Sequence, residues 1–88
     1  MNAQTRGVCY LLHFSRPYKH ARHYLGWTVN LQARLDQHLA GTGGRLLEVI
    51  TAEGIGFTLA RTWPDTTLRD EKRLKNHHAR HLCPICTP

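Results

Sequence analysis

A chain of 88 residues with 41% hydrophobic residues has room for one domain and one modest core. No apolar run approaches the roughly 20 residues that span a bilayer. The polar N-terminus also lacks the apolar stretch of a secretory signal, so we expect a cytoplasmic protein with no membrane partner. Twelve Lys and Arg against six Asp and Glu give a net charge of +6, which favours a polyanionic partner, most often nucleic acid.

Two apolar runs near the N-terminus predict an antiparallel hairpin. Residues 8–14 are almost continuously apolar, as in a central strand covered on both faces. Residues 23–27 form the second run, within a strand expected over about 22–28. Pro17 lies between them and is expected in the connecting loop, because proline cannot donate to a strand ladder.

The hairpin carries a tyrosine on each strand. If Tyr10 lies opposite Gly26, then Leu12 lies opposite Tyr24, and the two tyrosines share one face as diagonal neighbours. A slip of one residue would put them on opposite faces. This register is therefore the assumption on which any joint role of the tyrosines depends.

A helix is expected next, with Asn30 as its N-cap and Gly41 just beyond its C-terminus. Arg34 and His38, four residues apart, share a flank of this helix. An apolar stripe recurs every four residues, at Leu31, Leu35 and Leu39. Residues 46–50 carry no pattern that assigns them.

A third strand and a second helix complete the expected elements. Residues 55–63 alternate with period two and end at the Trp63–Pro64–Asp65 segment. Thr67 and Asp70 have the spacing of a capping box, which would open a helix over about 68–78. Glu71 then lies beside the inward stripe of an otherwise basic helix.

The order strand, strand, helix, strand, helix favours an α+β fold with a small three-stranded antiparallel sheet flanked by helices. We expect residues 1–88 to form a single domain, with a core over about 7–78 and a C-terminal tail over 79–88.

In this order and spacing, the segments resemble the GIY-YIG endonuclease family over about residues 7–76. Val8-Cys9-Tyr10 stands where that family has Gly-Ile-Tyr, and Tyr24-Leu25-Gly26 stands where it has Tyr-Ile-Gly. The helix pattern of Asn30, Arg34 and His38 follows, and Glu71 matches the position of the family's metal-binding glutamate. Val8 and Cys9 depart from the family pattern, and the late asparagine of many members has no counterpart here.

The resemblance implies a phosphodiester hydrolase, with Tyr10 as general base on water and Tyr24 orienting the water or relaying its proton. Arg34 would contact the scissile phosphate, and His38 would donate to a phosphate oxygen or assist Tyr10. Glu71 would hold one Mg²⁺ or Mn²⁺. Because an unperturbed tyrosine has a pKa near 10, nearby cations would have to lower the pKa of Tyr10. Arg34, Arg45 and Lys75 are candidate contacts to nucleic acid.

Each residue also has a purely structural interpretation. The tyrosines could be core aromatics with satisfied hydroxyls, and Arg34 and His38 could be solvated or capping residues. Glu71 could be a helix-surface carboxylate that pairs with Lys75 at i+4.

The C-terminal segment is rich in histidine and cysteine. A zinc site built from His78, His81, Cys83 and Cys86 is chemically reasonable, although a single CxxC is weak evidence. The alternative is a tail that packs Leu82 and Ile85 against the sheet.

The sequence thus predicts a metal-dependent DNA endonuclease, in DNA repair or mobile-element processing. The alternative is a non-catalytic nucleic-acid-binding module on the same scaffold. A small domain presents little base-reading surface, so we expect structured or branched DNA, or targeting by a partner protein.

Overall fold

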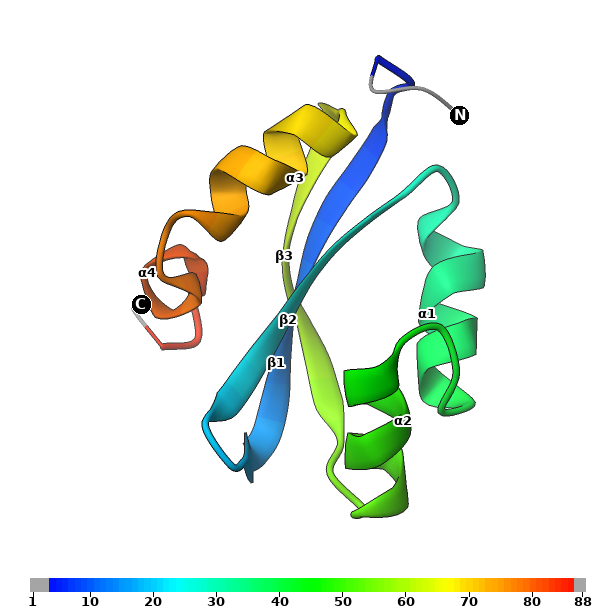
Figure 1. Ribbon diagram of the computed structural model, residues 1–88, viewed down its shortest axis with the longest axis vertical. Helices are drawn as coiled ribbons and strands as arrows, with labels where there is room; N and C mark the ends of the chain where they lie inside the picture. Colours follow the sequence, from blue (N-terminus) through cyan, green and yellow to red (C-terminus); the bar gives the residue numbers. More distant parts are fainter. Residues whose placement is uncertain (1–3, 87–88) are drawn as a thin grey trace.

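The computed structural model describes residues 4–86, and residues 1–3 and 87–88 of the expected domain lie outside the described part. Within residues 4–86 the chain forms a small α+β domain with three strands and four helices (Figure 1). The strands are β1 (Gly7–Tyr18), β2 (Ala21–Thr28) and β3 (Phe57–Thr66), and the helices are α1 (Leu31–Leu39), α2 (Arg45–Ala52), α3 (Leu68–Lys75) and α4 (Ala79–Leu82). No helix in this range is long and apolar enough to cross a membrane.

The strands form one antiparallel sheet in the order β2-β1-β3, which makes β1 the central strand. Figure 1 shows α1 and α2 on one side of the sheet and α3 and α4 on the other. This explains the nearly continuous apolar run at the start of β1, because helices cover the central strand on both of its faces. The predicted three-stranded antiparallel sheet with flanking helices is confirmed.

The register of the hairpin is the one that joins the two tyrosines. Tyr10 pairs with Gly26 and Leu12 pairs with Tyr24. Paired residues project to the same face, and alternate residues along a strand project to opposite faces. Tyr10 and Tyr24 therefore lie on the face that α1 and α2 cover, and their ring centroids are 6.2 Å apart.

The main core lies on this same face. It joins alternate residues of β1 to apolar side chains of α2 and of the turn that follows it. Its fully or almost fully buried members are Tyr10, Leu12, Phe14, Leu47, Ile50 and Ile55. On the opposite face, Cys9 and Leu11 of β1 are also fully buried. Tyr10 is thus part of the packing as well as a candidate functional residue.

Helix α1 begins and ends as predicted, but its buried face differs from the expected one. The Asn30 side chain accepts a hydrogen bond from the backbone N–H of Ala33, and Gly41 follows the helix with φ of 80°. Leu39, however, is 68% exposed, whereas His38 is fully buried. The expected leucine stripe stops after its first two residues, because His38 fills the core position and has polar partners there.

Both prolines predicted to lie outside strands fall inside them. Pro17 belongs to β1, in the segment where the pairing with β2 is irregular between His13 and Tyr18. Pro64 belongs to β3, beside a register shift near the start of β1, and the strand continues to Thr66. An irregular ladder tolerates proline because the missing N–H is not needed there.

The strict alternation predicted for the third strand is also interrupted. Leu12 pairs with Leu59 but Leu11 pairs with Arg61, so one extra residue, Ala60, bulges out. The bulge moves Arg61 onto the face of Leu11, where its guanidinium lies 4.6 Å from the centre of the Trp63 ring.

The helix before β3 was not predicted from the sequence, whereas the start of the helix after β3 was. The unassigned residues 46–50 belong to α2. The capping box of α3 is confirmed, because the Thr67 and Asp70 side chains each bond the other's backbone N–H. Helix α3 ends at Lys75 rather than at residue 78, and the short helix α4 follows.

Because Gly26 has no side chain, the Tyr10 ring can lie across β2. Replacing Gly26 therefore tests the packing of Tyr10. A Cβ at Gly26 would lie 2.4 Å from the Tyr10 hydroxyl oxygen. We expect Gly26→Ala to lower the free energy of unfolding in urea by about 1–3 kcal/mol.

Gly56→Ala is the matched control, because a Cβ there meets only the Ser15 hydroxyl, at 3.9 Å. Equal stabilities of the two variants would contradict this packing of Tyr10.

Candidate functional site

The centre of the candidate site is a hydrogen bond between two buried side chains. The Tyr10 hydroxyl lies 2.8 Å from Nε2 of His38, and both residues are fully buried. Strand β1 supplies the tyrosine, and the last turn of α1 supplies the histidine. A polar pair enclosed in an apolar core stabilises the fold only when both groups have partners.

The surroundings of His38 define which of its nitrogens carries a proton. Its Nδ1 lies 3.2 Å from the carbonyl oxygen of Thr42, which can only accept a hydrogen bond, so Nδ1 must donate. Burial lowers the pKa of His38, and the nearby charge of Arg34 lowers it further. The ring is therefore neutral at neutral pH, and its Nε2 accepts the proton that the Tyr10 hydroxyl donates.

Tyr24 completes an aromatic cluster with this pair. Its ring centroid lies 5.3 Å from that of His38 and 6.2 Å from that of Tyr10, and its side chain is only half-buried. The glycine loop before α2 closes over the cluster. A Cβ at Gly43 would lie 3.1 Å from Nδ1 of His38, and one at Gly44 would lie 3.5 Å from the Tyr24 hydroxyl. The approach at Gly43, whose φ is 85°, favours glycine, whereas the distance at Gly44 is an ordinary van der Waals contact.

The electrostatics around Tyr10 differ from the expectation that cations lower its pKa. Burial raises the pKa of Tyr10, and the neighbouring Tyr24 hydroxyl adds to the rise. The charge of Arg34 acts in the opposite direction but is too small to reverse it, and Glu71 raises the pKa further. In the protein alone Tyr10 is therefore a hydrogen-bond donor to His38 rather than a tyrosinate.

Arg34 and Glu71 approach the cluster from opposite sides of the sheet. Arg34 is half-buried on α1, and its charge affects the pKa of both Tyr10 and His38. Glu71 lies on α3, and its side chain is only 14% exposed. Its carboxylate pairs with the Lys75 ammonium at 3.3 Å, the i+4 contact of the structural interpretation. Glu71 is thus linked to Tyr10 through its charge and not through a contact.

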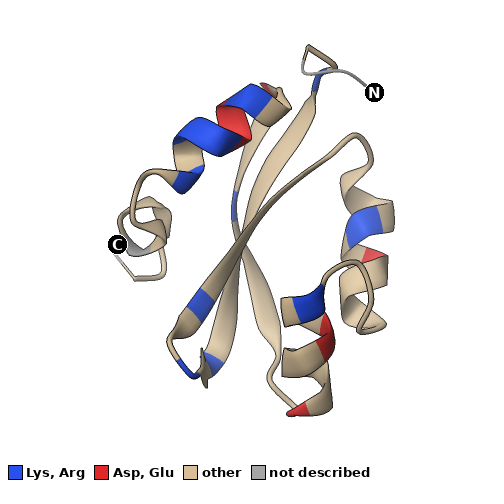
Figure 2. Ribbon diagram, viewed as in Figure 1, with Lys and Arg blue, Asp and Glu red and all other residues tan. Residues whose placement is uncertain are grey.

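The two further candidate contacts to nucleic acid are surface cations. Arg45 begins α2 with its side chain 88% exposed, 3.6 Å from Glu48, and Lys75 is 55% exposed. Figure 2 shows Lys and Arg spread over several elements, with half of the residues of α3 basic around Asp70 and Glu71. The positive charge is therefore distributed over the surface, with Arg16, Lys19 and Arg22 at the hairpin end and four basic residues beside two carboxylates on α3.

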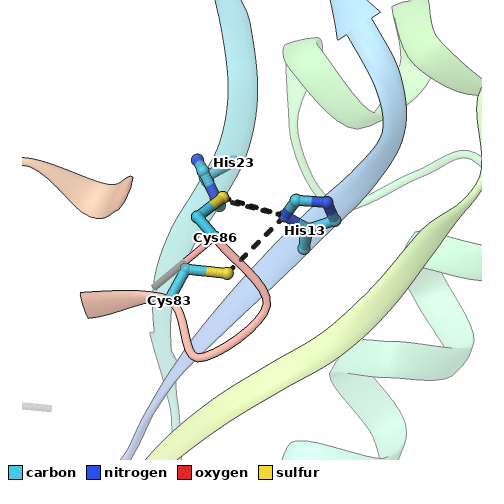
Figure 3. Close-up of side chains that lie close together, drawn as sticks. All are labelled: His13, His23, Cys83 and Cys86. Atoms are coloured by element: carbon cyan, nitrogen blue, oxygen red, sulfur yellow. Dashed lines mark hydrogen bonds between the residues drawn. The ribbon is translucent and has the colours of Figure 1, made fainter. Parts of the chain in front are cut away.

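A second cluster lies on the other face of the sheet. The paired residues His13 and His23 of the hairpin meet Cys83 and Cys86, which follow α4 (Figure 3). One ligand atom from each of the four side chains lies within 4.8 Å of the others. Burial lowers the pKa of His23, with smaller effects from His13 and Arg22, and this favours the neutral ring that binds metals. The structure therefore contains a group of side chains that could hold a metal ion.

This second cluster corrects the zinc ligands predicted from the sequence. Cys83 and Cys86 belong to it, but His78 and His81 do not. The rings of these two histidines lie edge to face with centroids 5.9 Å apart, and both residues are exposed. Sequence proximity suggested them, whereas the true neighbours are distant in sequence. The hairpin register could have identified His13 and His23, because pairing Tyr10 with Gly26 also pairs those two residues.

Comparisons with protein-family models, with curated proteins and with solved structures gave no match to this chain. The function must therefore be inferred from the geometry of the two clusters.

The lowered pKa of His38 predicts a specific pH dependence of stability. Between the folded pKa and the unfolded value near 6.5, the unfolded chain binds a proton that the folded chain does not. The contribution of His38 is thus complete above about pH 6.5 and is lost as the pH falls, by at most about 1.4 kcal/mol per pH unit.

We expect His38→Gln to reduce this pH slope in urea unfolding measured between pH 7.5 and 5.5. The control is His20→Gln, at an exposed position in the β1–β2 turn, which should keep the slope of the unmodified chain. An unchanged slope in His38→Gln would contradict the neutral, buried imidazole.

Proposed function

We propose that this protein is a divalent-metal-dependent endonuclease of the GIY-YIG type that hydrolyses phosphodiester bonds in DNA. The observation that carries the proposal is the buried hydrogen bond from Tyr10 to His38, with Tyr24 in contact with both rings. Residues 10, 24 and 38 come from three different elements, and the sequence pattern alone singles out each of them. A core designed only for packing has no need of this polar cluster.

Hydrolysis of a phosphodiester needs an activated water and positive charge beside the developing oxyanion. Arg34 suits the second need because its planar guanidinium can donate two parallel hydrogen bonds to a phosphate. Its effect on the pKa of both Tyr10 and His38 supports a position beside the cluster. Because Arg34 is half-buried on its helix, its side chain has fewer rotamers before binding and loses less conformational entropy when it binds a phosphate.

Water activation is assigned to the Tyr10–His38 pair rather than to a tyrosinate. As water attacks phosphorus, the bond from phosphorus to the leaving oxygen breaks. The water proton passes to the phenol oxygen of Tyr10, and the proton that Tyr10 held passes to Nε2 of His38. The positive charge then resides on an imidazolium, so no tyrosinate accumulates despite the raised pKa of Tyr10. Tyr24 is the more exposed hydroxyl and would orient the water or carry the proton inward.

Glu71 is the residue that would hold Mg²⁺ or Mn²⁺. Its carboxylate is largely enclosed and has only Lys75 as its ion-pair partner among the salt bridges of residues 4–86. A single carboxylate fits Mg²⁺, which takes the rest of its ligands from water and substrate phosphate. When bound, the ion supplies positive charge to the phosphate and the leaving oxygen. The second cluster, with two sulfur ligands, does not suit this ion.

Structured or branched DNA is the proposed substrate class. The net charge of +6 and the basic surface of α3 support a phosphate partner, while a domain of this size offers little surface for reading a long sequence. A partner protein would supply further targeting. The alternative, a nucleic-acid-binding module without turnover, shares the charge but has no use for an enclosed carboxylate.

The metal role of Glu71 predicts a separation of cleavage from binding. With Mg²⁺ or Mn²⁺ and a panel of duplex, flapped, branched and single-stranded DNA, the protein should nick or cut at least one substrate. Glu71→Gln keeps the side-chain shape but removes the charge, so we expect cleavage to be abolished and binding, measured by fluorescence anisotropy, to change less than threefold.

Glu48→Gln is the matched control, because Glu48 is an exposed helical carboxylate that pairs with Arg45. It should cleave like the unmodified chain. Binding without cleavage of any substrate, with either metal, would replace the endonuclease by the binding module.

The proposed proton transfer from Tyr10 to His38 predicts a loss of cleavage that is independent of the metal role of Glu71. Tyr10→Phe removes the hydroxyl that donates to His38, so the cleavage rate should fall by about 10²–10⁴-fold. The same change leaves Nε2 of His38 without its donor and should cost about 1–3 kcal/mol of unfolding free energy in urea. Tyr18→Phe, at the end of β1, should retain the rate; a similar loss there would contradict a specific role for Tyr10.

A further inference from the structure

The four side chains of the second cluster are spaced like the ligands of one tetrahedral ion. Nδ1 of His13 lies 3.5 Å from the sulfur of Cys83, 3.6 Å from that of Cys86 and 3.2 Å from Nε2 of His23. The Cys86 sulfur lies 3.3 Å from Nε2 of His23. Tetrahedral zinc, with bonds of about 2.0–2.1 Å to nitrogen and 2.3 Å to sulfur, separates its ligands by roughly 3.3–3.8 Å.

Hydrogen bonding alone does not account for this arrangement. Nδ1 of His13 has one lone pair or one proton, yet three partners surround it at 3.2–3.6 Å. Thiols are weak donors, and two neutral imidazoles give each other at most one hydrogen bond. A central cation explains why four lone-pair donors converge on one point.

We propose that His13, His23, Cys83 and Cys86 bind one Zn²⁺ ion. Two thiolates and two imidazoles are a common donor set of structural zinc, and thiolates disfavour Mg²⁺ and Ca²⁺. Four protein ligands fill the coordination sphere, which leaves no position for substrate, so the ion is structural. Figure 3 shows the two histidines on the hairpin strands and the two cysteines on the loop that faces them.

The zinc ion joins the C-terminal segment to the hairpin. In the described part of this segment, helix α4 has four residues, Ile85 is 47% exposed, Cys83 is buried, and the Leu82 carbonyl accepts a hydrogen bond from Arg61 at 3.3 Å. Of the two residues that the alternative would pack against the sheet, Ile85 is exposed and Leu82 is half-buried. The His13–His23 pair is next to the Leu12–Tyr24 pair in the ladder of β1 and β2. Zinc therefore also stabilises the strand register that positions the tyrosines.

The test is the metal content of protein produced without a histidine tag, measured by mass spectrometry of the metal. We expect one zinc per chain in the unmodified protein and near-complete loss in His13→Asn, His23→Asn, Cys83→Ser and Cys86→Ser. The matched controls, His78→Asn and His81→Asn, should keep one zinc per chain.

A second measurement does not depend on the folding of any variant. The unmodified chain, stripped of metal and given Co²⁺, should develop the intense visible bands and the sulfur-to-metal charge transfer of a tetrahedral site with two thiolates. Near-zero zinc in a folded unmodified chain, an octahedral cobalt spectrum, or zinc loss in the His78 and His81 variants alone would each overturn the proposal. These readouts are independent of DNA cleavage, so the zinc site and the endonuclease can fail separately.

Discussion

The pairing of Tyr10 with Gly26 in the ladder of β1 and β2 determines which side chains lie on each face of the sheet. With this register, the tyrosines project toward α1 and α2, and the histidine pair His13 and His23 projects toward α3 and α4. A slip of one residue would move Tyr24 to the face of His13 and His23 to the face of Tyr10, which would separate the members of both clusters. The central strand therefore supplies Tyr10 to one cluster and His13, three residues later, to the other, and both clusters depend on one alignment.

The candidate catalytic cluster is also part of the core. Tyr10 and His38 fill volume that an apolar pair would fill in a purely structural domain, and they remain satisfied because Thr42 and the tyrosine hydroxyl occupy both ring nitrogens. In a domain of 88 residues, few positions are available for packing alone. Because Tyr10 is a core residue as well as a candidate catalytic residue, burial raises its pKa. The proposed chemistry therefore passes the proton on from Tyr10 to the imidazole of His38.

Local patterns in the sequence predicted what is local in the structure. The caps at Asn30 and Thr67, the hairpin register and the first two strands follow from short-range propensities and alternation. The bulge at Ala60 and the burial of His38 in place of Leu39 depend on the packing of β3 and of α2, which no periodicity encodes. The cluster of His13, His23, Cys83 and Cys86 was predicted only in part for the same reason: cysteines and histidines that are 60 or more residues apart meet only through the tertiary fold.

The proposed endonuclease requires nucleic acid to reach Tyr10, Tyr24 and Arg34 on one side of the sheet as well as Glu71 of α3 on the other (Figure 1). The most direct measurement is a titration of the ¹⁵N-labelled Glu71→Gln protein with branched DNA and Mg²⁺, followed by the amide resonances. We expect the largest shifts at Gly26, around Arg34 and in the 42–44 loop, with small shifts at Cys83 and Cys86. Shifts confined to the cysteine side of the sheet, with the tyrosine face unchanged, would contradict the proposed site.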